Sequence, residues 1–221
     1  MKRMLRNAKR ALDQALGTVS DEWYWRLRHI FGKKGWAESY LSPESLESKE
    51  RKKFIEMLAA HGPIASALEI GCASGPNLVL LARAFPEAKL YGTDISGHAI
   101  AYGKRWLAEH NMPNITLETK RAEDLSGFAD KSIDIIFTNA ALFYVGPDKI
   151  GQAVHEMLRV AKKAIVLLEW NTEEAESLYA DHWAHNWKKL FADAGKDTVR
   201  LTKMEPDPWG VFGYYIEVPI T

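Results

Sequence analysis

The chain of 221 residues is predicted to fold as an α/β domain with a mostly parallel sheet. Short apolar segments alternate with helical segments through its middle, and segments that are apolar on both faces are typical of buried parallel strands. A turn rich in small residues follows the first of these segments, at the place where open α/β sheets bind ligands. We therefore expect a helix-covered sheet whose ligand site lies beyond the carboxyl ends of its strands.

The same patterns place seven strands and the helices between them. Strands are expected at residues 65–71, 89–93, 115–118, 133–138, 164–169, about 198–203 and 214–218, and helices at 77–85, 97–110 and 148–161. The last two strands are close in sequence, so an antiparallel pair is expected there. The predicted product is a seven-stranded, mostly parallel sheet with one antiparallel strand.

Residues 1–62 precede this region and are expected to form an N-terminal helical cap, while residues 63–221 form the ligand-binding domain of one folding unit. The segment 2–16 has an amphipathic pattern. Its apolar residues are Met4, Leu5, Ala8, Ala11, Leu12, Ala15 and Leu16, and its basic residues are Lys2, Arg3, Arg6, Lys9 and Arg10. We expect its apolar stripe to pack on the domain, with docking on a partner or attachment to an anionic membrane surface as alternatives.

The composition is that of an ordinary soluble globular protein. The chain has 29 Lys and Arg against 29 Asp and Glu, so no basic excess attracts nucleic acid, and none is expected as a partner. A single cysteine excludes an internal disulfide and fits a reducing compartment, hence a cytoplasmic location. No apolar run approaches the roughly 20 residues that cross a bilayer, and the N-terminus lacks the apolar core of a signal peptide.

The small-residue turn spans residues 68–77, with the sequence LEIGCASGPN. Gly71 and Gly75 provide clearance for the backbone to approach a ligand at a helix N-terminus. Ser74 is expected to cap the following helix, with Pro76 in its first turn. Taken alone, the motif also fits an ordinary strand-to-helix turn.

The second predicted strand ends at an acidic residue, Asp94, which lies 19 residues after Gly75. A carboxylate at this distance from the glycine turn accepts hydrogen bonds from both ribose hydroxyls of an adenosine-containing ligand. The alternative is that Asp94 only caps the next helix. The spacing of the two glycines, with none at position 73, differs from the Gly-x-Gly-x-x-Gly expected of an NAD enzyme.

Together these residues resemble the class I S-adenosylmethionine-dependent methyltransferases. The resemblance rests on Glu69-x-Gly71-x-x-x-Gly75, on Asp94 and on the segments 121–125, 132–142, 155–160 and 164–168. It implies a Rossmann-like three-layer sandwich that uses S-adenosyl-L-methionine. No metal is expected, because the pair Glu205 and Asp207 has no third ligand in view. The residues that the resemblance implies for cofactor binding are Glu69, Gly71, Cys72 and Gly75 at the methionine end, Asp94 at the ribose, Ile95, Ala122 and Glu123 around the adenine, and Asn139 at the methionine amino group.

One position departs from the family pattern. The family has an acidic residue before Ala122 that accepts from the adenine amino group, whereas this chain has Arg121, which carries only donors. Glu123 and Asp124 are then the nearest acceptors in the sequence. Cys72 is interpreted as a small residue of a tight turn rather than as a reactive thiol.

Aromatic residues gather in the segments that face the predicted site. The candidates for the acceptor pocket are Tyr24, Trp25, Phe143, Tyr144, Trp170 and Trp209. Core packing is the alternative, because Trp23 and Leu27, and likewise Trp183, Trp187 and Phe191, repeat at helical spacing. His182 and His185 lie in a predicted helical stretch and are candidate general bases, with packing or surface histidines as the alternative.

The resemblance implies methyl transfer to an oxygen or nitrogen of a small molecule. Methylation of a protein or nucleic acid is an alternative within the same chemistry. A non-catalytic methyltransferase-like domain that binds cofactor or a partner is an alternative of a different class, and a reductase on a related sheet is a more distant one.

Overall fold

The computed structural model of the protein describes residues 19–31, 35–174, 177–179, 182–205 and 213–220. The amphipathic segment 2–16 and Trp209 lie outside these ranges, so their predicted roles stay predictions. Within the described ranges, no helix is both long and apolar enough to cross a membrane.

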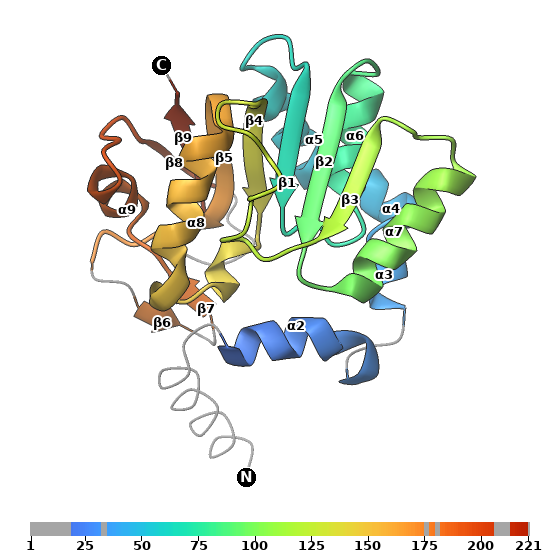
Figure 1. The fold of residues 1–221 in the computed structure, drawn as a ribbon, viewed down its shortest axis with the longest axis horizontal. Coiled ribbons are helices and arrows are strands. Elements are labelled where there is room, and N and C mark those ends of the chain that lie inside the picture. Colours follow the sequence, from blue (N-terminus) through green and yellow to red (C-terminus); the bar gives the residue numbers. More distant parts are fainter. Residues whose placement is uncertain (1–18, 32–34, 175–176, 180–181, 206–212, 221) are drawn as a thin grey trace.

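A seven-stranded sheet forms the centre of the molecule (Figure 1), in the order β3-β2-β1-β4-β5-β9-β8. Its strands are β1 (Ser66–Ile70), β2 (Lys89–Asp94), β3 (Ile115–Thr119), β4 (Ile133–Asn139), β5 (Ala161–Trp170), β8 (Arg200–Lys203) and β9 (Gly213–Pro219). Strands β1 to β5 are parallel, and β9 pairs antiparallel with both β5 and β8. The predicted sheet with one reversed strand is confirmed, and its strand bounds differ from the predicted ones by a few residues at most.

The register brings three strand ends to one place. The last residue of β1, Ile70, pairs with Thr93 of β2 on one side and with Thr138 of β4 on the other. Because the three strands are parallel, the connections that leave them emerge at the same edge of the sheet. The segments after Ile70, Asp94 and Asn139 therefore meet although they are distant in sequence.

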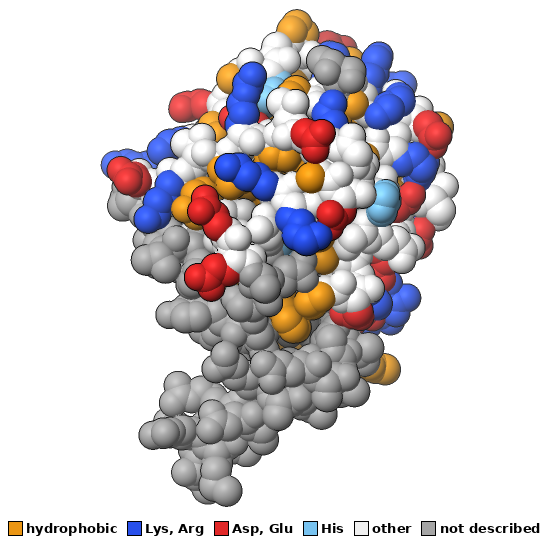
Figure 2. All heavy atoms as spheres, turned by 90° about the vertical axis from the view of Figure 1, so that its left-hand side faces the viewer, with side chains coloured by type: hydrophobic (Ala, Val, Ile, Leu, Met, Phe, Trp, Pro, Cys, Tyr) orange, Lys and Arg blue, Asp and Glu red, His pale blue; other side chains and the backbone are white. Residues whose placement is uncertain are grey.

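Helices cover both faces of the sheet. Helices α5 (Lys49–Ala59), α6 (Pro76–Ala84) and α7 (Gly97–Glu109) share one buried cluster with Phe137, whereas α8 (Pro147–Val160) and α9 (Trp187–Asp193) share another with Ile136. Neighbouring residues of β4 thus enter opposite layers, as the period of a strand requires. On the face that Figure 2 shows, acidic and basic side chains are interspersed rather than gathered by sign.

The cap consists of α2 (Val19–Phe31), α3 (Trp36–Ser39), α4 (Pro43–Leu46) and α5. Its last helix belongs to the main core, where the Phe54 and Phe137 rings lie 5.9 Å apart between centroids. Helix α2 instead lies across the carboxyl ends of the strands (Figure 1). Trp23 on α2 was predicted from its spacing to suit the core, but its side chain is 60% exposed, because the helix turns a different face to the domain.

The predicted helical stretch around His182 and His185 is wrong. Residues Ser177–Tyr179 (β6) and His182–Ala184 (β7) form a two-stranded antiparallel pair, and His185 makes an isolated bridge with Asn171. Helix α9 starts only at Trp187, after Asn186, whose side chain accepts from the Lys189 N–H at 3.0 Å. Trp183, Trp187 and Phe191 are spaced four residues apart, but the first lies on a strand and the other two on a helix. Spacing alone does not distinguish this arrangement from one continuous helix.

Candidate functional site

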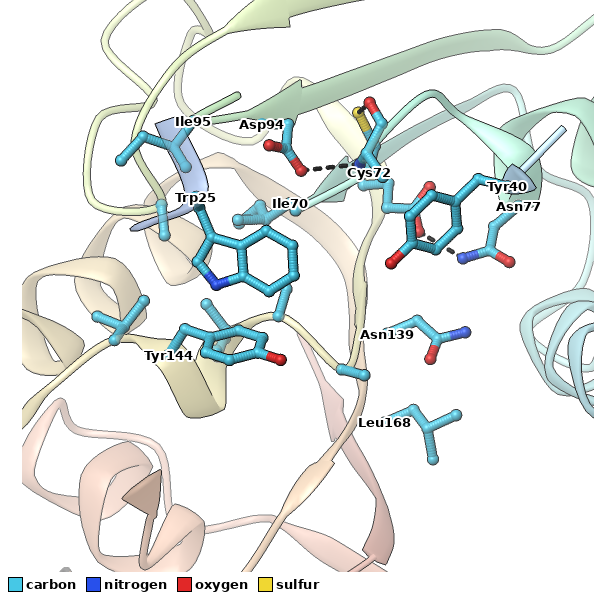
Figure 3. A pocket seen from close by; sticks show the side chains of 18 of the residues that line it. Trp25, Tyr40, Ile70, Cys72, Asn77, Asp94, Ile95, Asn139, Tyr144 and Leu168 are labelled. Carbon is cyan, nitrogen blue, oxygen red and sulfur yellow. Dashed lines mark hydrogen bonds between the residues drawn. The ribbon is translucent and has the colours of Figure 1, made fainter. Parts of the chain in front are cut away.

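A cavity of about 370 Å³ lies between the carboxyl ends of the strands and the cap, a volume within the range of small-molecule sites. Figure 3 shows Asp94 and Ile95 on one side of it, Asn139 and Leu168 on another, and the rings of Trp25 and Tyr144 between them. Of the residues predicted to hold a cofactor, those that line the cavity are Glu69, Gly71, Cys72, Asp94, Ile95, Ala122, Glu123 and Asn139.

The glycine turn has the backbone that its sequence predicts. Gly71 and Gly75 have φ of +74° and +90°, in the left-handed region that favours glycine. A Cβ on Gly71 would lie 2.2 Å from the Ala141 Cβ, so this glycine also permits the loop after β4 to approach. Gly75 does not line the cavity. It occupies the cap position of α6 predicted for Ser74, whose hydroxyl instead donates to the Ala37 carbonyl at 2.5 Å.

Asp94 holds the turn from the neighbouring strand. Its carboxylate accepts from the backbone N–H groups of Ala73 and Ser96, each at 2.8 Å, and it faces the cavity. Burial raises the pKa of Asp94, and these backbone hydrogen bonds act in the opposite direction. Ser96 takes the cap position of α7, with its side chain accepting from the Ala99 N–H, so Asp94 is not the residue that caps this helix.

A buried polar chain joins the cap to β1. Asn77 on α6 donates to Glu69 Oε1 at 2.5 Å and accepts from the Arg51 guanidinium at 2.7 Å. Glu69 Oε2 is buried and has no hydrogen-bond partner among the described residues. Burial raises the pKa of Glu69 to about 8, although Asn77 and Arg51 act to lower it. The sequence analysis missed Arg51 and Asn77. Asn77 stands inside the turn motif, where a polar side chain was a usable signal, whereas nothing in the sequence around Arg51 indicates its role.

Charged residues converge beside Ala122. The Arg121 guanidinium donates to Glu22 Oε2 at 2.9 Å and 3.2 Å, and Lys149 Nζ lies 3.3 Å from Glu123 Oε1. Lys149 also donates to Glu22, which belongs to α2. Of the two acceptors that the sequence offered, Glu123 lines the cavity, whereas Asp124 lines only a neighbouring hollow.

The surroundings of Cys72 disfavour the thiolate form. Its side chain is buried, and burial raises the pKa of the thiol well above its ordinary value, with the Asp94 and Glu69 carboxylates acting in the same direction. A thiol that stays protonated is a poor nucleophile. The structure therefore favours the interpretation of Cys72 as a small residue of the turn.

The aromatic candidates divide between the cavity and the core. Trp25 and Tyr144 line the cavity, with ring centroids 4.7 Å apart. Phe143 and Trp170 do not reach it, because they are buried in a separate cluster with Ala184. Tyr24 is 48% exposed and also does not line it. The sequence analysis did not select several other residues that line the cavity, among them Trp36, Tyr40, Leu168 and Met204.

Neither candidate histidine lines the cavity. His185 is fully buried, with Nε2 lying 3.3 Å from the Leu142 carbonyl oxygen. His182 packs among the rings of Phe143, Tyr144 and Trp170, at centroid distances of 4.8, 4.9 and 5.2 Å. Both histidines thus lie outside the cavity, packed against neighbouring residues.

Comparisons with known proteins find a family match in the middle of the chain. Residues 67–164 match the family described as a methyltransferase domain. The chain is 31% identical over 173 residues, 75% of its length, to the chondramide synthase of Chondromyces crocatus, of which the match spans 4%. It is 31% identical over 94 residues, 42% of its length, to the trans-aconitate 2-methyltransferase of Deinococcus radiodurans, of which the match spans 33%. The chain thus spans less than half of each of these curated relatives.

A solved structure extends the similarity over most of the chain. The magnesium protoporphyrin IX methyltransferase of Synechocystis, crystallised with bound SAH, superposes with a TM-score of 0.68 at 16% identity, and the match covers 91% of this chain and 100% of that one. At this level of identity the likeness shows a shared fold.

Proposed function

Since the chain carries the domain of the class I S-adenosylmethionine-dependent methyltransferases over residues 67–164, we propose that it transfers a methyl group from S-adenosylmethionine to a small molecule. The acceptor atom is an oxygen or a nitrogen. The observation that carries the proposal is that two carboxylates, the buried one of Glu69 and the half-buried one of Asp94, face one cavity at the carboxyl edge of the sheet.

The charges at the methionine end fit a zwitterion. Glu69 Oε2 is an acceptor without a partner among the described residues, and the Arg51 guanidinium lines the same cavity. An ammonium beside Glu69 would provide the partner that the buried Oε2 atom lacks, and a carboxylate would fit beside the positive charge of Arg51. Gly71, Cys72 and Asn139 would hold the methionine part by backbone and amide contacts.

The ribose and adenine of the cofactor would lie on the opposite side of the cavity, beside Asp94 and Ile95. Asp94 would accept from the ribose hydroxyls, because a carboxylate has about four lone-pair sites and two backbone N–H groups occupy only part of them. Ile95 would lie against the adenine, with Ala122 and Glu123 at the rim of its pocket.

The chain's contribution to the reaction is positioning and exclusion of water. The cofactor supplies a methyl group that its sulfonium already activates. Trp25 and Tyr144 close the cavity under α2, and a dry, oriented acceptor needs little further help. No histidine of the described residues lines this cavity, so the reaction would not depend on His182 or His185 as a base.

A small-molecule acceptor is favoured over a macromolecule. Relatives are named for trans-aconitate and magnesium protoporphyrin IX as acceptors, and the cap closes over the strand ends here. The balanced charge of 29 basic and 29 acidic residues gives no general attraction to nucleic acid. The single thiol, which is buried, fits the proposed cytoplasmic location.

Calorimetry with S-adenosylhomocysteine tests the cofactor site. The wild type should bind, and Asp94→Ala should weaken binding by about ten- to a hundredfold, because it removes charge-assisted hydrogen bonds. Asp130→Ala, at a carboxylate that is 75% exposed, is the matched control and should bind as the wild type does. Circular dichroism must show the same fold, since Asp94 also holds the Ala73 N–H. Unchanged affinity in a folded Asp94→Ala protein would remove Asp94 from the site, and a wild type that does not bind would contradict the proposed function.

A further inference from the structure

The acidic residue that the family has before Ala122 is replaced by Arg121, yet a carboxylate still reaches this place. It belongs to Glu22, which lies 99 residues away in sequence, on α2. The Glu22 side chain is 11% exposed and lines the cavity. The cap therefore brings a carboxylate to the cavity, next to the guanidinium of Arg121.

Two cations hold the Glu22 carboxylate from different elements. Arg121, after β3, donates to Oε2 at 2.9 Å and 3.2 Å, and Lys149, in the first turn of α8, donates to Oε1 at 2.5 Å. Burial acts to raise the pKa of Glu22, but the hydrogen bonds from Lys149 and Arg121 outweigh it and lower the pKa. Glu22 is therefore ionised at neutral pH, which makes it an acceptor only.

The neighbouring acidic residues are less suited to a ligand in this cavity. Asp124 lines the adjacent hollow, together with Arg26, Gln152 and Arg159, and its Oδ1 accepts from the backbone and hydroxyl of Ser126. Glu123 lines both hollows and stands at the boundary between them. Glu22 lines the main cavity and not the adjacent hollow.

We propose that Glu22 accepts a hydrogen bond from the exocyclic amino group of the cofactor's adenine, so that the cap helix completes the purine site. Arg121 and Lys149 are positioning residues that hold the carboxylate. The inference rests on the proposed function, because the adenine is that of S-adenosylmethionine. It makes the cap part of cofactor recognition as well as a cover for the acceptor.

The test compares S-adenosylhomocysteine with its analogue in which the adenine amino group is replaced by hydrogen. The readout is the ratio of the two dissociation constants, measured by calorimetry. The wild type should prefer the amino compound by at least about tenfold, the effect of one hydrogen bond to a charged acceptor. Glu22→Ala should bring the ratio close to one, and Glu22→Gln, whose amide oxygen still accepts, should give an intermediate ratio. A loosened cap would weaken both ligands alike, so the ratio reports this one contact.

Glu38→Gln is the control, because Glu38 belongs to the same cap, on α3, is exposed and does not line the cavity. It should keep the preference of the wild type. The inference is overturned if Glu22→Ala keeps that preference, if Glu38→Gln loses it, or if the wild type binds both compounds equally. A wild type that binds neither compound would instead contradict the proposed function.

Discussion

The strand-end turn, residues 66–96, and the cap, residues 19–59, meet at the same cavity but are built in different ways. The turn is held by partners within about one strand-helix-strand unit, such as Asp94 and Ala73. Helix α2 of the cap is held by partners far away in sequence, such as Glu22 with Arg121 and with Lys149. A local motif thus makes one wall of the site, and only folding makes the other.

The two regions also differ in how firmly they are held. Gly71 and Asp94 lie beside buried strands, whereas α2 is held by the ion pairs of Glu22 and by aromatic contacts. The Arg28 guanidinium lies 4.3 Å from the Trp25 ring centroid and 4.9 Å from that of Trp36, an arrangement in which the cation is attracted to the ring faces. Partly exposed ion pairs add little. We therefore expect α2 to open more readily than the turn.

The largest effect is expected at Gly71. Gly71→Val should abolish binding of S-adenosylhomocysteine, because the side chain would clash with Ala141 and the φ of +74° is strained for valine. The clash is within the protein, so the melting temperature should fall as well. Gly151→Ala, in α8 with open space around it, should bind normally and melt no lower. Full binding by a folded Gly71→Val protein would show that the turn is not the cofactor cradle.

The next effect concerns pH and Glu69. If an ammonium binds beside this carboxylate, the proton held with a pKa of about 8 must leave, so affinity should rise about tenfold per pH unit until roughly pH 8. In the free protein, Glu69 changes the free energy of unfolding with pH in the direction opposite to that of a usual carboxylate, whose pKa is lowered on folding. The pKa of Glu69 in the folded protein lies above the unfolded value of 4.5. Its contribution to stability is therefore complete below pH 4.5 and is lost as the pH rises through about 8.

Calorimetry of S-adenosylhomocysteine binding between pH 6 and 8 measures this dependence. Glu69→Gln is the control, since it keeps the shape and leaves the titration of the ligand's own amino group unchanged. The difference in slope between the two proteins isolates Glu69. Equal slopes would mean that no ammonium binds at this carboxylate.

The smallest effect separates the two faces of α2. Trp25 packs on Tyr144, whereas Trp23 is 60% exposed. Trp25→Ala should increase hydrogen exchange across α2 several-fold and reduce the protection that S-adenosylhomocysteine adds there, because a buried aromatic contact is lost. Trp23→Ala should change neither quantity. If both variants exchange as the wild type does, or if the ligand protects only the turn around Gly71, the cap does not close over the cofactor.

The sequence by itself determined the sheet and the wall of the site that depends on backbone conformation. Residues with distinctive backbone preferences mark it: Gly71 and Gly75 adopt the positive φ that glycine tolerates, and Pro76 starts α6. Asp94 ends β2 beside them. Runs that are apolar on both faces predicted the parallel strands because such a sheet is covered on both sides. Where two structures share one spacing, as around His182 and Trp187, the sequence was ambiguous and the prediction failed.

Only the tertiary structure decided which side chains complete the site. Glu22 and Arg51 reach it through contacts that span up to 127 residues along the chain, such as that between Glu22 and Lys149. Phe143 and Trp170 were indistinguishable in sequence from Tyr144, yet they turn into a separate cluster. How far a side chain is buried, and which way it points, depend on the residues that pack against it, and these are set by the whole fold. A strand-to-helix turn instead depends mainly on the backbone preferences of its own few residues, and so it could be predicted from them.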